Sequence, residues 1–246
     1  MNKTAENIAP KEIFRFKQFA VAQDKCTMKI GTDGVLLGAW ASVENAANAL
    51  DIGAGSGVIA IMLGQRNPTL KVHAVEIDDA SAAQCADNMK SAPWANRLSV
   101  QDISLQNFAA QTDVLFDLLV SNPPFFSGGT FSSDENRNNV RHTVKLPHGD
   151  LLNAAKKLLS PKGKFCVILP YIEGLRFAEL AETYHFYLTK MTEVKPLAQK
   201  SVERLLLQFE LSPKILEKDE LVIQYEKRND WTAAYQALTG DFYLKI

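Results

Sequence analysis

The sequence predicts an α/β fold in which helices cover both faces of a mostly parallel sheet, with an antiparallel hairpin at one edge. Five short apolar runs are the predicted parallel strands: residues 48–53, 71–78, 97–102, 116–122 and 164–170. Each run is nearly continuous, as expected of strands that are buried on both faces. Helical periodicity near 58–66, 79–90 and 148–159 fills the intervals, so strands and helices alternate along the middle of the chain.

The segments around this alternation predict further elements. Residues 160–163, Ser-Pro-Lys-Gly, predict a turn. Residues 184–194 and 202–212 predict two strands without a crossover helix, and therefore the antiparallel hairpin. Alternation between Phe14 and Ile30 predicts a second, small hairpin. Thr32 is expected to cap an apolar helix that follows it and forms a lid over the ligand edge of the sheet.

One α/β domain accounts for the length of the chain. A chain of 246 residues, 46% of them hydrophobic, can bury one sizeable core. We expect an N-terminal extension and lid at 1–42, a core at 43–212, and a C-terminal strand and short helix at 213–246 that pack on the core. The sequence assigns no role to this last segment.

The composition argues against several classes of protein. The first dozen residues lack the apolar core of a signal peptide, and no apolar run is long enough to span a bilayer. We therefore expect a cytoplasmic protein without a membrane partner. Cys26, Cys85 and Cys166 are far apart, and none has a metal-ligand spacing with a histidine. Neither a disulfide nor a bound metal is expected.

Charge is distributed unevenly, although the net charge is only -1. Residues 51–121 hold four Lys or Arg and eight Asp or Glu, whereas residues 122–165 hold seven and three, and residues 1–30 hold six and three. If the basic segments converge in space, they could bind phosphates beside a more acidic cofactor half. Ordinary solvated surface explains the same counts equally well.

A glycine-rich motif lies where the first parallel strand ends and a helix begins: Asp51-Ile52-Gly53-Ala54-Gly55-Ser56-Gly57. Glycines at alternate positions let the backbone turn sharply and lie against a ligand. Val58 stands where a dinucleotide fingerprint has Gly or Ala, and no Walker lysine is present. The loop therefore suits a nucleoside with an amino-acid tail, and a purely structural turn is the alternative.

Acidic residues end the next two strands. Glu76 lies about 20 residues beyond the glycine motif, the usual position for accepting hydrogen bonds from ribose hydroxyls. Asp102 could accept a hydrogen bond from an adenine amino group, while Ile77 and Ile103 could contact the faces of the ring. For each carboxylate the alternative is a helix N-cap or a solvated side chain.

The tetrapeptide Asn122-Pro123-Pro124-Phe125 follows the fourth strand. An exocyclic amine is a poor nucleophile because its lone pair is delocalised into the ring. The Asn122 side-chain oxygen and the Pro123 carbonyl could accept both N–H groups and leave the lone pair free to attack a methyl donor. Phe125 offers a face on which a planar base can stack. We therefore predict Asn122, Pro123 and Phe125 as catalytic residues, with Asn122 also near the cofactor; a rigid turn is the alternative.

With these motifs the chain resembles the amino-methylating class I methyltransferases over Phe14 to about Leu211. That family has a Rossmann-like, seven-stranded sheet and uses S-adenosyl-L-methionine. Within it, the chain is most similar to the bacterial valine-tRNA adenine-N6 methyltransferases, through residues 28–41, the tetrapeptide with the Phe126-Ser-Gly-Gly that follows it, and Arg141-His142. The resemblance implies N6-methylation of the adenine 3′ to the anticodon, position 37. It also places Lys29, Thr32 and Asp33 near the methionine part of the cofactor.

A tRNA substrate would give roles to side chains along the second half of the chain. An anticodon-loop base is already poorly paired, so extracting it costs less than flipping a base out of a duplex. The candidates for RNA binding are Arg137, Arg141, His142, Lys145, Lys195, Lys200 and Arg204. Generic surface charge is the alternative for the basic residues, and structural support for His142. Phe126 could line the base pocket or belong to the core. We expect a monomer that transfers the methyl group directly.

Three other functions stay open. A ribosomal-RNA guanine-N2 methyltransferase often carries an additional domain. A protein-glutamine methyltransferase usually has Tyr in place of Phe125 and a helical N-terminal substrate domain, which some 30 residues here cannot provide. A non-catalytic RNA-binding scaffold would not need intact Asp51, Glu76 and Asn122, and would not bind S-adenosylmethionine.

Overall fold

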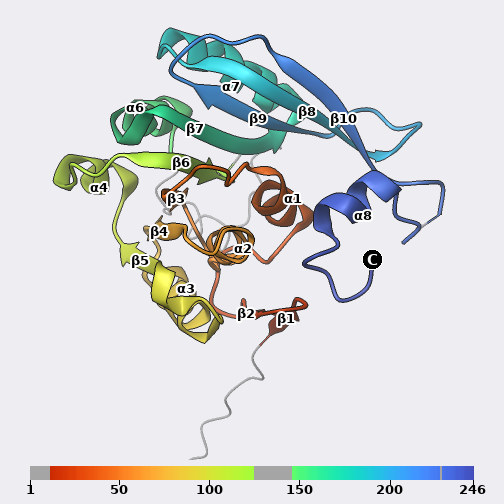
Figure 1. Cartoon of the computed structure of the whole chain (residues 1–246), viewed down its shortest axis with the longest axis horizontal. Helices are drawn as coiled ribbons and strands as arrows, with labels where there is room; N and C mark the ends of the chain where they lie inside the picture. Colours follow the sequence, from red (N-terminus) through yellow and green to blue (C-terminus); the bar gives the residue numbers. More distant parts are fainter. Residues whose placement is uncertain (1–11, 125–145, 228) are drawn as a thin grey trace, which may run out of the picture.

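The computed structural model describes residues 12–124, 146–227 and 229–246. Its main feature is a sheet of eight strands in the order β10-β8-β9-β7-β6-β3-β4-β5 (Figure 1). The strands are β3 (Asn48–Ile52), β4 (Lys71–Glu76), β5 (Leu98–Asp102), β6 (Phe116–Ser121), β7 (Leu159–Pro170), β8 (Tyr187–Leu197), β9 (Arg204–Glu210) and β10 (Glu217–Gln224). The predicted α/β fold with a mostly parallel sheet is confirmed.

The pairing of the strands shows that the sheet has one strand more than the seven that were predicted. Strands β5, β4, β3, β6 and β7 pair in parallel, and β9 is antiparallel to both β7 and β8. The predicted hairpin is therefore β8 with β9. It does not form the edge of the sheet, because β10 pairs in parallel with the outer side of β8. The C-terminal strand thus raises the number of strands from seven to eight.

Helices cover both faces of the sheet, as predicted. On one face lie α1 (Thr32–Trp40), α2 (Val58–Arg66), α3 (Asp79–Ser91) and α8 (Ala233–Thr239); on the other lie α4 (Leu105–Gln111), α6 (His148–Leu158) and α7 (Tyr171–Thr183). A short 3₁₀ helix, Ala95–Arg97, precedes β5. Because successive side chains of a strand point to opposite faces, neighbours such as Ala49 and Leu50 belong to different cores.

The N-terminal hairpin is present, but two expectations for the helix after it are wrong. Strands β1 (Ile13–Arg15) and β2 (Ala20–Ala22) pair antiparallel. Helix α1 is buried from Gly34 to Ala39 and packs against α2 and α8, so it belongs to the covering layer and is not a lid. Its N-cap is Gly31 without a side-chain hydrogen bond, and Thr32 is its first residue. A helix that is apolar all round is buried rather than laid over an open edge.

The turn expected at 160–163 is also wrong, because β7 runs through these residues. Opposite β6 the register shifts between Phe116, which pairs with Leu159, and Leu118, which pairs with Lys164. A Cβ atom on Gly163 would lie 2.8 Å from the Phe116 carbonyl oxygen. The Pro and Gly that suggested a turn therefore mark a bulge in which two backbones approach closely.

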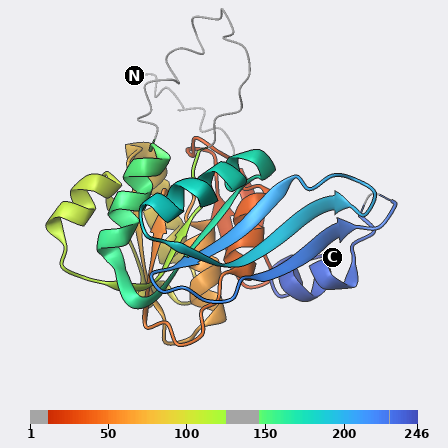
Figure 2. The same cartoon turned by 90° about the horizontal axis from the view of Figure 1, so that it is seen from above.

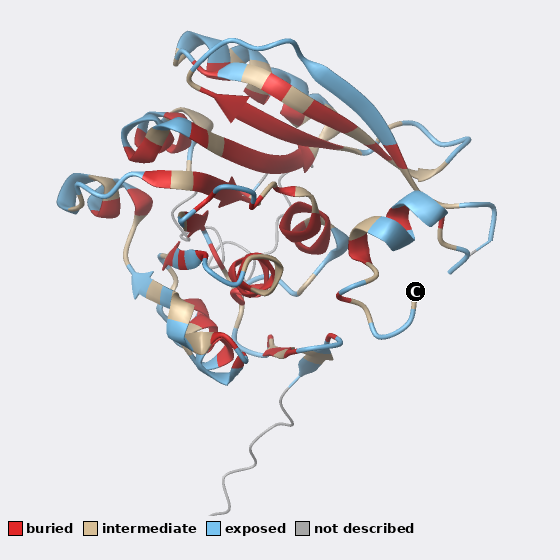
Figure 3. Cartoon of the chain, in the orientation of Figure 1, coloured by how far each residue is buried: buried red, intermediate tan, exposed pale blue. Residues whose placement is uncertain are grey.

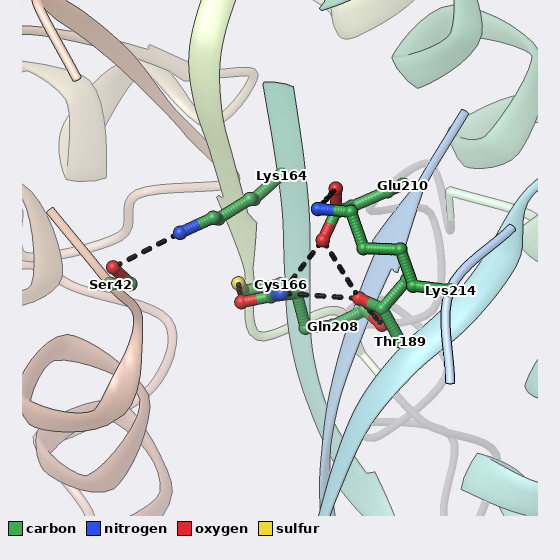
Figure 4. A network of polar contacts seen from close by, with 7 residues as sticks. All are labelled: Ser42, Lys164, Cys166, Thr189, Gln208, Glu210 and Lys214. Atoms are coloured by element: carbon green, nitrogen blue, oxygen red, sulfur yellow. Dashed lines mark hydrogen bonds and ion pairs between the residues drawn. The ribbon is translucent and has the colours of Figure 1, made fainter. Parts of the chain in front are cut away.

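The outer strands extend away from the rest of the sheet, with α8 packed against β10 (Figure 2). Edge strand β5 and outer strand β10 are largely exposed, whereas β6 and β7 are largely buried (Figure 3). At the end of β9 the buried Glu210 carboxylate accepts hydrogen bonds from Thr189 Oγ1 at 3.1 Å and Gln208 Nε2 at 3.2 Å, and it pairs with Lys214 (Figure 4). These partners compensate a buried charge that would otherwise be costly.

Candidate active site

The predicted site residues gather at the carboxyl edge of the parallel strands. Ile52 pairs with both Val75 and Ser121, and Glu76 pairs with Asp102. Strands β3, β4, β5 and β6 therefore end at the same level. In an open α/β sheet this edge is where ligands bind, so the structure brings the glycine motif, both predicted acids and the start of the tetrapeptide to one ligand-binding edge.

The glycine motif forms a tight loop between β3 and α2. Gly53, Gly55 and Gly57 have φ angles of +72°, +53° and +79°, the left-handed region that other residues rarely adopt. The N–H groups of Gly53 and Ala54 both donate to the Val75 carbonyl, at 2.9 and 3.2 Å. A Cβ atom on Gly57 would lie 2.7 Å from the Cys85 sulfur of α3. The loop is thus held between β4 and α3 in a conformation that requires glycine.

The Glu76 carboxylate accepts hydrogen bonds from the backbone of the glycine loop and from the residues that follow β4. Its Oε2 accepts a hydrogen bond from Gly55 N–H at 2.8 Å, and its Oε1 accepts from Ile77 and Asp78 N–H at 2.8 and 3.0 Å. Its own carbonyl accepts from Ile103 N–H at 2.9 Å. A carboxylate has about four lone-pair sites, so Glu76 can position the loop and still accept from a ligand hydroxyl.

The predicted adenosine contacts surround the ends of β4 and β5. The Ile77 side chain is 40% exposed, Asp102 is exposed, and Ile103 is half-buried. An exposed isoleucine at a ligand edge can cover one face of a planar ring, because burying its apolar surface is favourable. These residues therefore lie at the ligand-binding edge, and their contact with an adenine stays a prediction.

The Asp51 side chain is buried under the glycine loop and is not exposed at the ligand-binding edge. It is 1% exposed, and its Oδ2 accepts a hydrogen bond from Ala60 N–H of α2 at 3.1 Å. Its Oδ1 has no partner among the described residues. Burial raises the pKa of this carboxyl to about 7; the bond from Ala60 opposes the rise, and the charge of Glu76 adds to it. Asp51 thus ties the loop to α2 from below.

Asn122 lines a cavity at the same edge. Ser121, the last residue of β6, donates a hydrogen bond from Oγ to the Ile52 carbonyl at 3.0 Å and holds the strand end. The next side chain, Asn122, has a buried Oδ1 without a partner in the part of the chain that the structure describes. A buried acceptor without a partner is costly, which is the state expected of a group that meets its partner on a substrate.

The cavity has a volume of about 640 Å³ and joins Asn122 to the residues expected near the methionine part of the cofactor. Lys29, Thr32 and Asp33 at the start of α1 all line it. Asp33 Oδ2 accepts a hydrogen bond from Arg204 Nε of β9 at 2.8 Å, in an ion pair across the cavity wall. The cavity therefore brings together the residues expected near the methyl donor and Asn122, which is expected to bind the amine that accepts the methyl group.

Sequence analysis missed the opposite wall of this cavity. Val194, Pro196 and Leu197 line it from the end of β8, and Ile223, Gln224, Trp231 and Tyr235 line it from the C-terminal segment. The apolar pattern of residues 220–226 predicted a strand, but only the pairing of β10 with β8 brings that strand to the site.

The structure describes only some of the basic residues that were proposed to bind RNA. Lys195 forms an ion pair with Glu220 at 2.6 Å, Arg204 pairs with Asp33, and Lys200 is exposed. Lys29 pairs with Glu12 at 2.8 Å. The remaining candidates lie outside the described residues: Phe125, Phe126, Arg137, Arg141, His142 and Lys145. Pro123 is described and buried.

Two properties bear on the chemistry and the setting of the site. Within residues 12–124, 146–227 and 229–246, no three His, Cys, Asp or Glu side chains form a group that could hold a metal ion. No helix in the same ranges is both long and apolar enough to cross a membrane.

Comparison with known proteins agrees with this geometry. The methyltransferase small domain family matches residues 29–193. The chain is 43% identical over 234 residues to a tRNA1(Val) (adenine(37)-N6)-methyltransferase of Shigella dysenteriae, covering 94% of each chain. It is 40% identical to the enzyme of the same name from Histophilus somni, covering 97% of this chain and all of the relative.

A solved structure supports the fold. The chain matches a predicted O-methyltransferase from Agrobacterium tumefaciens with a TM-score of 0.70 and 17% identity, over 85% of this chain and 96% of the other. At that identity the likeness concerns the fold alone. Together with the family match and the high coverage of both relatives, it shows that the chain belongs to the methyltransferase small domain family, as an S-adenosylmethionine-dependent methyltransferase related to the tRNA adenine-N6 enzymes.

Proposed function

We propose that this enzyme transfers a methyl group from S-adenosylmethionine to the N6 amino group of adenine 37 in valine tRNA. The proposal is carried by Asn122, which lines the same cavity as Thr32 and Asp33 and whose buried Oδ1 has no partner among the described residues. Both relatives are tRNA1(Val) (adenine(37)-N6)-methyltransferases by name, which supports this substrate. An amide oxygen that awaits an N–H donor is suited to an amine substrate.

The described residues fit the cofactor. The left-handed Gly53 and Gly55 leave open space where a side chain would stand, so the nucleoside can rest against the backbone there, and Glu76 lies beside the loop for the ribose. Ile77, Asp102 and Ile103 would hold the adenine, while Lys29, Thr32 and Asp33 would hold the amino-acid tail. The sulfonium group of the bound cofactor supplies an activated methyl group. This division of the edge accounts for each predicted cofactor residue except Asp51, which supports the loop from below, and Asn122, which would hold the target amine.

The chain's own residues would orient the amine. Asn122 Oδ1 and the Pro123 carbonyl would each accept one N–H group of the target, which directs the nitrogen lone pair at the methyl carbon. The methyl carbon would leave the sulfonium sulfur as it joins the amine nitrogen, and the nitrogen would then release one proton to water. Phe125, predicted to stack on the target base, lies outside the described residues. Positioning accounts for the rate, and no covalent enzyme intermediate is required.

The finer parts of the proposal are the valine isoacceptor, a monomeric enzyme and a cytoplasmic location, as expected of a protein that modifies tRNA. The divisions at 1–42, 43–212 and 213–246 also stay predictions. We further propose that RNA phosphates contact the predicted basic residues and His142: Arg137, Arg141, His142, Lys145, Lys195, Lys200 and Arg204. A guanine of ribosomal RNA and a glutamine side chain are the competing acceptors.

The experiment supplies labelled S-adenosylmethionine with unmodified valine tRNA, ribosomal RNA or a release factor, and identifies the methylated product after digestion. Label in N6-methyladenosine of the tRNA alone is the expected result. A valine tRNA with guanine at position 37 is the matched control and should stay unlabelled. Label in guanine or glutamine would overturn the substrate while keeping the amine chemistry.

A further inference from the structure

The C-terminal segment forms part of the site because its strand, β10, pairs in parallel with β8. Because β10 is parallel to β8, both strands end at the edge where β6 ends. Ile223 and Gln224, at the end of β10, therefore line the same cavity as Asn122. The chain then turns and returns to Gln224 through a single bridge with Trp231. Part of the cavity wall opposite α1 is thus formed by residues that follow the seven strands expected of the fold.

Trp231 is held firmly in this wall. Thr232 N–H donates to the Ile223 carbonyl at 3.1 Å, and Tyr225 N–H donates to the Asp230 carbonyl at 2.8 Å. Behind it, Thr232 Oγ1 accepts a hydrogen bond from Tyr235 N–H at 3.1 Å and caps α8. The rings of Trp231 and Tyr235 lie 5.2 Å apart at an angle of 32°. The indole is half-buried and lines the cavity.

The cavity suits a neutral, planar group beside the target base. Its volume of about 640 Å³ is that of a pocket for a whole drug-sized ligand, more than one purine requires. The lining near Trp231 is apolar, with Val194, Leu197 and Ile223. The charged residues of the lining, two basic and two acidic, give it no net charge and therefore no net attraction for a phosphate: Lys29, Asp33, Glu203 and Arg204. An aromatic base satisfies these conditions better than the phosphate backbone does.

We infer that Trp231 is a stacking platform for a base that neighbours the methylated adenine in the RNA. The inference rests on the proposed function and assigns to the C-terminal segment a part in RNA binding. A base stacked on an aromatic side chain contributes about 1–3 kcal/mol. Loss of the indole should therefore weaken RNA binding about 5- to 100-fold.

The test compares Trp231→Ala and Trp231→Phe with the unchanged enzyme, using an anticodon stem-loop of valine tRNA. We expect Trp231→Ala to raise the Kd for this RNA about 5- to 100-fold while the Kd for S-adenosylmethionine stays within about twofold, and Trp231→Phe to restore most of the RNA affinity. Tyr225→Ala is the matched control, since Tyr225 is 52% exposed on the same segment and does not line the cavity. It should bind RNA like the unchanged enzyme.

A second measurement identifies the base. Stem-loops with an abasic site on the 3′ or the 5′ side of adenine 37 are bound to the unchanged enzyme and to Trp231→Ala. If Trp231 stacks on that neighbour, the abasic RNA and the variant lose the same interaction, and their effects are not additive. Additive effects at both sites, equal RNA affinity of Trp231→Ala, or an equal loss of cofactor affinity would overturn the inference. Failure of the unchanged enzyme to methylate the stem-loop or the full tRNA would instead overturn the proposed function.

Discussion

The Asn88 side chain joins the N-terminal hairpin to the glycine loop: its Nδ2 donates to the Ser56 carbonyl at 2.9 Å. The same amide donates to the Ala22 carbonyl at 2.8 Å, and its Oδ1 accepts from Ala22 N–H at 2.9 Å. Asn88 is 5% exposed on α3. Sequence analysis missed this residue, although a polar side chain on the buried face of a helix is a signal that it satisfies backbone groups.

Replacing Asn88 with Ala should therefore weaken both stability and cofactor binding. Leaving the buried Ser56 carbonyl without its donor costs about 1–3 kcal/mol in the free energy of unfolding, and the loop that it supports holds the cofactor. Chemical denaturation and the Kd for S-adenosylmethionine measure the two effects. Ser91→Ala, at the exposed end of the same helix, is the control and should change neither. A loss of stability with unchanged cofactor affinity would show that the bond supports only the hairpin.

Glu76→Gln should weaken the binding of S-adenosylmethionine more than it lowers the rate of turnover. The substitution keeps the shape of the side chain but removes a charge that accepts hydrogen bonds from Gly55, Ile77 and Asp78 N–H. Hydrogen bonds to a charged group contribute about 1.5–3 kcal/mol, so the Kd for S-adenosylmethionine should rise roughly 10- to 100-fold. Titration calorimetry measures it, with Asp79→Asn on the exposed first turn of α3 as control. Unchanged affinity would mean that the ribose binds elsewhere.

Asn122→Ala should abolish turnover while cofactor binding stays nearly intact. The variant loses the buried side-chain acceptor of a residue that lines the cavity, and a misplaced nucleophile costs about 100-fold or more in rate. Single-turnover methylation of tRNA gives the rate, and calorimetry gives the Kd for S-adenosylmethionine. Asn107→Ala, exposed on α4, should retain full activity. An equal loss of turnover and cofactor affinity would refute the assigned role.

Asp51 predicts a pH dependence of stability. Burial raises the pKa of its carboxyl from 3.8 to about 7, so between about pH 4 and pH 7 the folded protein binds more of this proton than the unfolded chain does. The contribution of Asp51 to the free energy of unfolding therefore falls as the pH rises through that range and is constant above it. In Asp51→Asn the free energy of unfolding should therefore decline less between about pH 4 and pH 7.

The measurement is chemical denaturation from pH 4 to pH 8 for both proteins. The difference between them isolates Asp51, because burial lowers the pKa of His73 and His148 in both and their contribution cancels. Identical pH profiles would show that Asp51 titrates like an exposed carboxyl.

Arg204 and Asp33 should couple across the cavity wall. Their side chains are 29% and 22% exposed, and the pair joins β9 to the start of α1. A double-mutant cycle of Arg204→Met and Asp33→Asn, read out as the Kd for S-adenosylmethionine, should give a coupling of roughly 0.5–1 kcal/mol, because partial exposure screens the pair. Independent effects would show that the ion pair does not position the start of α1. Lys195 and Glu220 are the control pair, which should not affect cofactor affinity.

Much of the fold and the cofactor half could be predicted from sequence, because local patterns determine them. Continuous apolar runs bounded by polar residues predicted β3 to β7, and the left-handed glycines of the loop follow from Gly53, Gly55 and Gly57 themselves. The structure confirms the order of these elements and brings Glu76, Asp102 and Asn122 to one edge. Parallel strands joined by short helices leave few other arrangements.

Expectations that depended on a local signal alone were less secure. Pro161 and Gly163 predicted a turn, but the backbone of β6 pairs beside them and makes the segment a bulge. Thr32 is a good capping residue, yet Gly31 occupies the cap of α1. In both places a tertiary contact or the path of the chain outweighs a local preference worth about 1 kcal/mol.

By itself, the sequence determined which residue types meet at the site and predicted their roles: a glycine loop for the cofactor, a carboxylate for the ribose and an amide beside prolines for an amine. Only the tertiary structure decided how far the site extends, because β10 adds to β8 in parallel and brings Trp231 to the Asn122 cavity. Motif chemistry resides in neighbouring residues and can be read along the chain. The pairing of β8 with β10, and the burial of Asn88 between hairpin and loop, depend on contacts between residues distant in sequence, which no local pattern specifies.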